Sequence, residues 1–119
     1  MTTRIGFTGH RDKFASLSTL NGIGNAVGGA GYVWVHGGAI GFDTQIERYA
    51  RAHNIPTDVI KPEYGKYSAK IAPIFRNMEI VDSVEEIFAL WDGRKTGGTY
   101  MTIEYAKKKN KKVTIIPVG

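Results

Sequence analysis

The chain has 119 residues, the size of one ordinary domain, and 42% of them are hydrophobic, which excludes general disorder. It contains no cysteine, which excludes disulfides, thiolate zinc sites and thiol catalysis. The net charge is +5, and the compact basic run 107–112, which holds five lysines, leaves the rest of the chain nearly neutral.

The first third of the chain predicts two strands with a helix between them. The apolar runs 4–8 and 32–36 are typical of strands. The segment 17–28 predicts a helix, which three glycines weaken. The residues expected on its apolar face are Leu17, Leu20, Ile23 and Val27.

A second helix and a third strand follow. The segment 43–53 has apolar residues at i, i+3, i+4 and i+7, and 56–60 predicts a strand. The helix face consists of Ile46, Tyr49, Ala50 and His53.

The segment 61–70 has no clean period and predicts a long loop, a feature often tied to function in compact domains. Pro73 suits the first turn of a third helix. The apolar face expected for this helix consists of Ile71, Ile74, Phe75, Met78 and Val81.

The last third predicts a strand over 87–91, a helix over 99–109 and a strand over 113–118. Strands that alternate with helices indicate a parallel sheet with right-handed crossovers. We therefore predict a single domain over 1–119 of the α/β class. Its architecture is a Rossmann-like three-layer sandwich with a five-stranded, mainly parallel sheet in the order 3-2-1-4-5.

Three glycine-bearing turns, at 6–11, 36–43 and 92–99, each follow a predicted strand. In a parallel sheet these turns meet at the carboxyl edge, where ligands bind. Glycine permits close backbone approach, and a turn that opens a helix directs N–H groups at an anion. The sequence therefore predicts a phosphate-bearing ligand at this edge.

Several side chains in the first two turns have more than one interpretation. Arg11 either faces solvent or binds a phosphate through two guanidinium N–H groups. Asp43 is either the N-cap of the second helix or an acceptor for a ligand hydroxyl. His36 is either a buried structural residue or a general acid, and without a paired cysteine or second histidine a metal role is not expected.

The third helix adds Arg76 and Asn77, and the loop before it carries Tyr64 and Tyr67, which are able to stack on a base. The predicted ligand-binding residues are Thr8, Gly9, Arg11, Gly37, Gly38, Ala39, Gly41, Asp43, Tyr64, Tyr67, Arg76, Asn77, Gly97, Gly98 and Thr99. The candidate catalytic residues are Arg76, Glu104 and Asp43, although Glu104 is also explained as a solvated carboxylate pairing with Lys108.

The chain resembles the SLOG superfamily of Rossmann-like nucleotide-binding proteins, and within it the YpsA-related, DUF2493-type domains. The matching segments span nearly the whole chain: 6–11, 36–43, 73–77 and Gly97-Gly98-Thr99 followed by Ile103 and Ala106. The resemblance implies binding of a mononucleotide or an ADP-ribose-like signal at the sheet edge.

Two branches of this superfamily supply alternatives. LOG-type enzymes hydrolyse the N-glycosidic bond of nucleoside monophosphates with an arginine and with the glutamate of a PGGxGTxxE motif. Arg76 stands for the arginine, but no proline precedes the glycines, Thr102 takes the position of the glutamate, and Glu104 comes two residues later. DprA-like proteins, the second branch, bind single-stranded DNA.

We expect a small nucleotide as the partner, no required cofactor and no metal. The lysines of 107–112 are either a nucleic-acid patch or a solvated helix end, and the second interpretation is favoured because no aromatic residues interleave them. Nucleic acid is therefore not the expected partner. No apolar run reaches the length of a membrane span and no signal pattern is present, so we expect a cytoplasmic protein. Homo-oligomerisation stays open.

Overall fold

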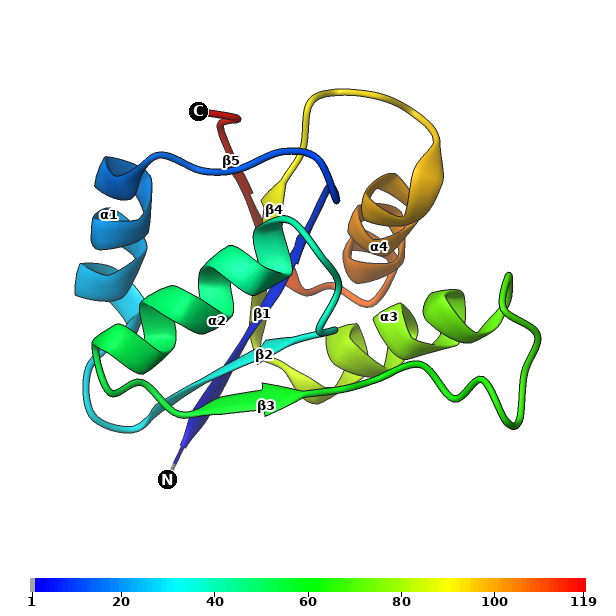
Figure 1. The fold of residues 1–119 in the computed structure, drawn as a ribbon, viewed down its shortest axis with the longest axis horizontal. Coiled ribbons are helices and arrows are strands. Elements are labelled where there is room, and N and C mark those ends of the chain that lie inside the picture. Colours follow the sequence, from blue (N-terminus) through cyan, green and yellow to red (C-terminus); the bar gives the residue numbers. More distant parts are fainter. Residues whose placement is uncertain (1) are drawn as a thin grey trace.

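Five strands form one all-parallel sheet in the computed structural model, which describes residues 2–119 (Figure 1). The order across the sheet is β3-β2-β1-β4-β5, which confirms the predicted order and the α/β class. The strands are β1 (Thr3–Gly9), β2 (Tyr32–His36), β3 (Thr57–Val59), β4 (Glu86–Leu90) and β5 (Lys112–Ile116).

Four helices cover the two faces of this sheet (Figure 1). They are α1 (Leu17–Val27), α2 (Phe42–Ala52), α3 (Ala72–Ser83) and α4 (Gly97–Lys108). Successive side chains of a strand point to opposite faces. Trp34 accordingly packs in the cluster under α1 and α2, whereas its neighbour Val35 packs in the cluster under α3 and α4. The result is the three-layer sandwich that the sequence predicts.

The predicted faces of α1 and α2 are confirmed except at one residue each. Leu20, Ile23 and Val27 are buried, but Leu17 is 66% exposed. In α2 the exception is His53, which follows the last residue of the helix and is exposed, although its ring stacks on Tyr49. Both exceptions lie at helix ends.

The predicted apolar face of α3 is wrong. Of its five residues only Val81 is buried, whereas Ile71 and Phe75 are 40% and 44% exposed. The remaining two, Ile74 and Met78, are half-buried. Figure 1 gives the reason: the first half of α3 extends outward from the sheet, next to the connection 60–71, so only its last turns reach the core.

The connection 60–71 contains neither helix nor strand, which confirms the loop predicted over 61–70; the predicted strand 56–60 is one residue longer at each end than β3. Pro73 lies in the first turn of α3, also as predicted. Within residues 2–119 no helix is long and apolar enough to cross a membrane.

Candidate functional site

A cleft of about 670 Å³ opens at the carboxyl edge of the sheet, between the turn after β1, the start of α3 and the start of α4. Ten of the predicted ligand-binding residues line it: Thr8, Gly9, Arg11, Ala39, Asp43, Arg76, Asn77, Gly97, Gly98 and Thr99. The structure thus brings together residues from all three glycine turns. Gly37, Gly38, Gly41, Tyr64, Tyr67 and Glu104 lie outside the lining.

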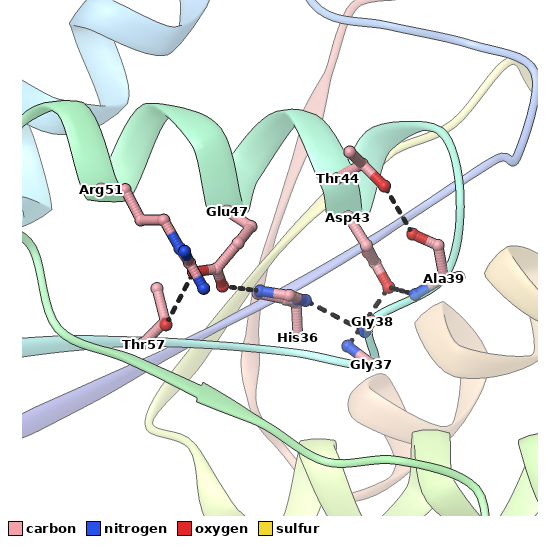
Figure 2. Close-up of polar contacts among 9 residues, drawn as sticks. All are labelled: His36, Gly37, Gly38, Ala39, Asp43, Thr44, Glu47, Arg51 and Thr57. Atoms are coloured by element: carbon pink, nitrogen blue, oxygen red, sulfur yellow. Dashed lines mark hydrogen bonds and ion pairs between the residues drawn. The ribbon is translucent and has the colours of Figure 1, made fainter.

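The turn between β2 and α2 is filled by a side chain of the protein itself. One carboxylate oxygen of Asp43, Oδ2, accepts hydrogen bonds from the backbone N–H groups of Gly37 and Ala39, each at 3.2 Å (Figure 2). Asp43 is therefore not the N-cap of α2; that position belongs to Gly41, whose φ of +85° suits glycine. Burial raises the pKa of the Asp43 carboxyl.

His36, 2% exposed, ties this turn to α2. Its Nδ1 accepts a hydrogen bond from the N–H of Gly38 at 3.0 Å. The ring proton therefore lies on Nε2, which donates to Oε1 of Glu47 at 2.7 Å (Figure 2). Both ring nitrogens are occupied within the protein, which favours the structural interpretation of His36 over the general acid.

Glu47 extends the network toward β3. Its Oε2 accepts hydrogen bonds from Arg51 Nε at 2.7 Å and from the hydroxyl of Thr57 at 3.2 Å (Figure 2). The hydrogen bond from Arg51, followed by those from His36 and Thr57, lowers the pKa of Glu47 to about 2. Sequence reasoning missed Glu47, although its position one turn after Asp43 in α2 was a usable signal.

Gly37 makes room for Arg76 rather than for a ligand. A side chain on Gly37 would collide with the Arg76 guanidinium, whose Nη1 donates to the Gly37 carbonyl at 2.5 Å. The Nε of Arg76 donates to Oδ1 of Asn77 at 2.8 Å. A guanidinium has five N–H donors, so these two bonds leave three for the cleft that Arg76 lines.

The turn that opens α4 has, within the described chain, no side-chain cap, and the same is true of α2 and α3; at α4 the glycines that follow the N-cap residue line the cleft. Thr96 is the N-cap residue, and its hydroxyl makes no capping hydrogen bond. Gly97, at φ +91°, and Gly98 follow, and both line the cleft. The first N–H groups of a helix lack helical partners and carry the positive end of its dipole. An anion in the cleft would meet these groups directly.

Sequence reasoning also missed His10, which joins two of the turns. The residue is 8% exposed, and its Nε2 accepts the backbone N–H of Asp92 at 3.2 Å. Burial, followed by the charge of Arg94, lowers the pKa of His10, so the ring is neutral at pH 7. Its place immediately after the first glycine turn was the available signal.

The charged lining of the cleft is predominantly basic. Lys70, which sequence reasoning did not single out, joins Arg11 and Arg76. Arg94 also lines the cleft, but its guanidinium is hydrogen-bonded to both carboxylate oxygens of Asp92. The carboxyl side chains of the lining are Asp12 and Asp43.

The remaining predicted residues lie apart from the cleft. Tyr64 is 57% exposed, and Tyr67 packs against Phe75 with ring centroids 4.7 Å apart. Glu104 is exposed on α4 and accepts a hydrogen bond from Tyr100, which raises the pKa of that phenol. Neither tyrosine of the 60–71 connection covers the cleft here, and the glutamate does not reach it.

The basic run 107–112 lies at the opposite edge of the sheet. It joins the end of α4 to the start of β5, whereas the cleft lies beyond the strand ends. Lys111 donates to the carbonyl of Val84 at 2.7 Å, and the ammonium of Lys109 lies over the ring of Tyr105. At least these two lysines thus have contacts within the protein.

No protein-family model and no curated protein matches the sequence. Among solved structures, the chain is similar to DNA processing protein A (DprA) from Streptococcus pneumoniae, with a TM-score of 0.76 and 16% identity. The match covers 99% of this chain and 51% of the other, so the chain spans about half the length of that protein. This likeness establishes a shared fold and is consistent with Rossmann-like relatives; assignment to the DUF2493-type domains stays a prediction.

Proposed function

We propose that the chain binds a small phosphorylated nucleoside in the cleft at the carboxyl edge of the sheet. The observation that carries the proposal is the convergence of two kinds of unused donor. The uncapped N-terminus of α4 and the remaining N–H groups of Arg76 line the same cleft. Backbone amides at a helix start and an arginine fork are both suited to a phosphate.

The local electrostatics support an anionic ligand. Arg11, Lys70 and Arg76 line the cleft, and the carboxylate of Asp43 accepts two backbone N–H groups, which partly offset its negative charge. The neutral ring of His10 adds no positive charge to the cleft and instead joins two of the turns through its hydrogen bond with Asp92. We expect the ribose beside Gly97 and Gly98, two neighbouring lining residues without side chains.

Binding is favoured over hydrolysis of the N-glycosidic bond. An oxocarbenium-like transition state needs a carboxylate nearby. Glu104 lies outside the cleft, and one oxygen of Asp43 is already engaged by two backbone N–H groups. Hydrolysis therefore stays an alternative that depends on Asp43, and chromatography of free base after incubation with nucleoside monophosphates tests it.

Single-stranded DNA is a second candidate ligand, favoured by the fold that the chain shares with DprA. On this alternative the strand follows the cations of the cleft, and binding weakens steeply with salt in proportion to the phosphates neutralised. A mononucleotide that competes with the strand would place both ligands in the same cleft.

Calorimetry and thermal shift with nucleoside monophosphates, ADP-ribose and a short oligonucleotide test the proposal. A ligand at 100 times its dissociation constant stabilises the fold by ~2.7 kcal/mol. Arg11→Ala removes a charged donor and should weaken binding by about 10- to 100-fold. Lys108→Ala, at the far edge of the sheet, is the matched control and should leave affinity unchanged. Binding that is insensitive to Arg11 but lost with Lys108 would overturn the site.

A further inference from the structure

Two half-buried apolar residues of α3, Ile74 and Met78, border a second hollow, distinct from the cleft. This groove, of about 160 Å³, lies between α3 and α4 and is mostly apolar. Met78 and Met101 provide thioether side chains there, and Ile74 adds an aliphatic one. Met101 is 48% exposed. An apolar hollow that a fold leaves open commonly serves a ligand or partner.

The groove is continuous with the phosphate cleft. Four residues, Ile74, Asn77, Gly98 and Met101, line both hollows. Gly98 lies at the junction, and a Cβ there would stand 3.6 Å from Nδ2 of Asn77. The missing side chain leaves a passage from the uncapped end of α4 to the groove. A ligand anchored by its phosphate can therefore extend directly into apolar surroundings.

Asn77 is oriented for recognition at this junction. Its Oδ1 accepts from Nε of Arg76, so the amide NH₂ is directed away from Arg76 and toward Gly98. Arg76, which holds the phosphate in the proposed site, thus also fixes the direction of the Asn77 amide NH₂. That NH₂ is available to a carbonyl or ring nitrogen of a ligand.

We infer that the α3–α4 groove holds the nucleobase of the bound nucleotide, with Met78 and Met101 against the ring faces and Asn77 donating to its edge. The inference rests on the proposed function. A base suits this lining because planar rings make favourable contacts with thioether sulfur, whereas the hydroxyls of a second sugar would be buried without partners. An apolar cavity of about 150 Å³ is known to accept a benzene-sized ring, which is comparable to this groove.

Nuclear magnetic resonance of the protein with ¹³C-labelled methionine methyls tests the placement. Ribose 5-phosphate, UMP and AMP are the probes, since the first has the sugar and phosphate but no base. All three should shift the amide signals of Gly97 and Gly98. Only the nucleotides should shift the methyl signals of Met78 and Met101, because only they bring a ring current into the groove.

Affinity measurements supply a second, independent readout. A nucleotide should bind about tenfold more tightly than ribose 5-phosphate. Met78→Gln should abolish that difference without changing the affinity for ribose 5-phosphate, and Met78→Leu should restore it. Phe14→Gln, at an exposed apolar residue near α1, is the matched control and should change neither value.

The outcomes separate the two proposals. Shifted glycine amides with silent methionine methyls for both nucleotides would overturn the base subsite and leave the phosphate cleft intact. No shift from any probe would overturn both. Methionine signals that move with protein concentration rather than with nucleotide would show that a second copy of the chain covers the groove, and this would also overturn the base subsite.

Discussion

Two turns of this protein look alike in sequence and differ in what they leave open. Both follow a strand, contain two adjacent glycines and open a helix: 36–43 leads into α2 and 92–99 into α4. In the first turn Asp43 accepts two of the backbone N–H groups, and His36 accepts a third. In the second turn side chains also accept backbone N–H groups, those of Asp92 and Arg94, but within the described chain the N-cap side chain makes no bond to the N–H groups that begin α4.

The difference teaches that a glycine pair after a strand does not by itself make an anion site. The first turn already contains its anion, the carboxylate of Asp43, and is a rigid support for Arg76. The second turn has its helix N–H groups exposed to the cleft and is the part suited to an external phosphate. Substitutions that fill the first turn should therefore mainly lower stability, whereas those that fill the second turn should mainly weaken ligand binding.

The largest effect is expected at Gly41. Its φ is +85°, and a side chain there would strike the backbone of Arg11, which cannot move aside as a flexible side chain would. Gly41→Ala should destabilise the protein by about 3 kcal/mol or more, measured by urea unfolding. Gly97→Ala, at φ +91° but in open space, is the control and should lose only about 1 kcal/mol. Equal losses would contradict the distinction between the turns.

The next effect is expected at Asp43. Asp43→Ala leaves the N–H groups of Gly37, which is buried, and Ala39, which is half-buried, without their acceptor. The free energy of unfolding should fall by about 2 kcal/mol. Thr44→Ala removes one exposed hydroxyl bond from the next residue and should lose less than half of that. A variant of Asp43 as stable as the wild type would show that the turn does not depend on its internal carboxylate.

The unfolding free energy should depend on pH through Glu47, which is linked to the first turn by His36. Because its pKa is lowered in the folded protein to about 2, from an ordinary value of 4.5, its ionised form stabilises the fold. That stabilisation is complete above pH 4.5 and is lost as the pH falls toward 2. Glu47→Gln should remove most of the pH dependence of the unfolding free energy across this interval. If the Glu47→Gln variant still lost stability steeply over this interval, groups other than Glu47 would be responsible for the acid transition.

The smallest change in stability, and the clearest change in binding, is expected at Gly98. Alanine there has ordinary space and favours a helix, so Gly98→Ala should alter unfolding free energy by no more than about 1 kcal/mol, in the stabilising direction. The added methyl narrows the passage between the cleft and the groove and should weaken nucleotide binding in calorimetry. Unchanged affinity would place the phosphate away from α4.

The sequence alone determined the architecture, because local periodicity and turn chemistry fix which segments become strands and helices. The strand predicted over 32–36 has the same bounds as β2. The predicted order of the five strands is also the order in the structure. It also predicted that Thr8, Arg11 and Gly98 would share one edge, since parallel strands place their following turns together.

Only the tertiary structure decided how each of these residues is used. The spacing of apolar residues defines one face of a helix but does not say what that face packs against. The first half of α3 was therefore predicted to be buried, although it extends past the sheet. The residue type of Asp43 suggested either a helix cap or an acceptor for a ligand hydroxyl, yet the path of the chain places its carboxylate against the N–H groups of Gly37 and Ala39. Hydrogen bonds between residues distant in sequence, such as Arg76 to Gly37, depend on how the helices dock, and no local pattern encodes that docking.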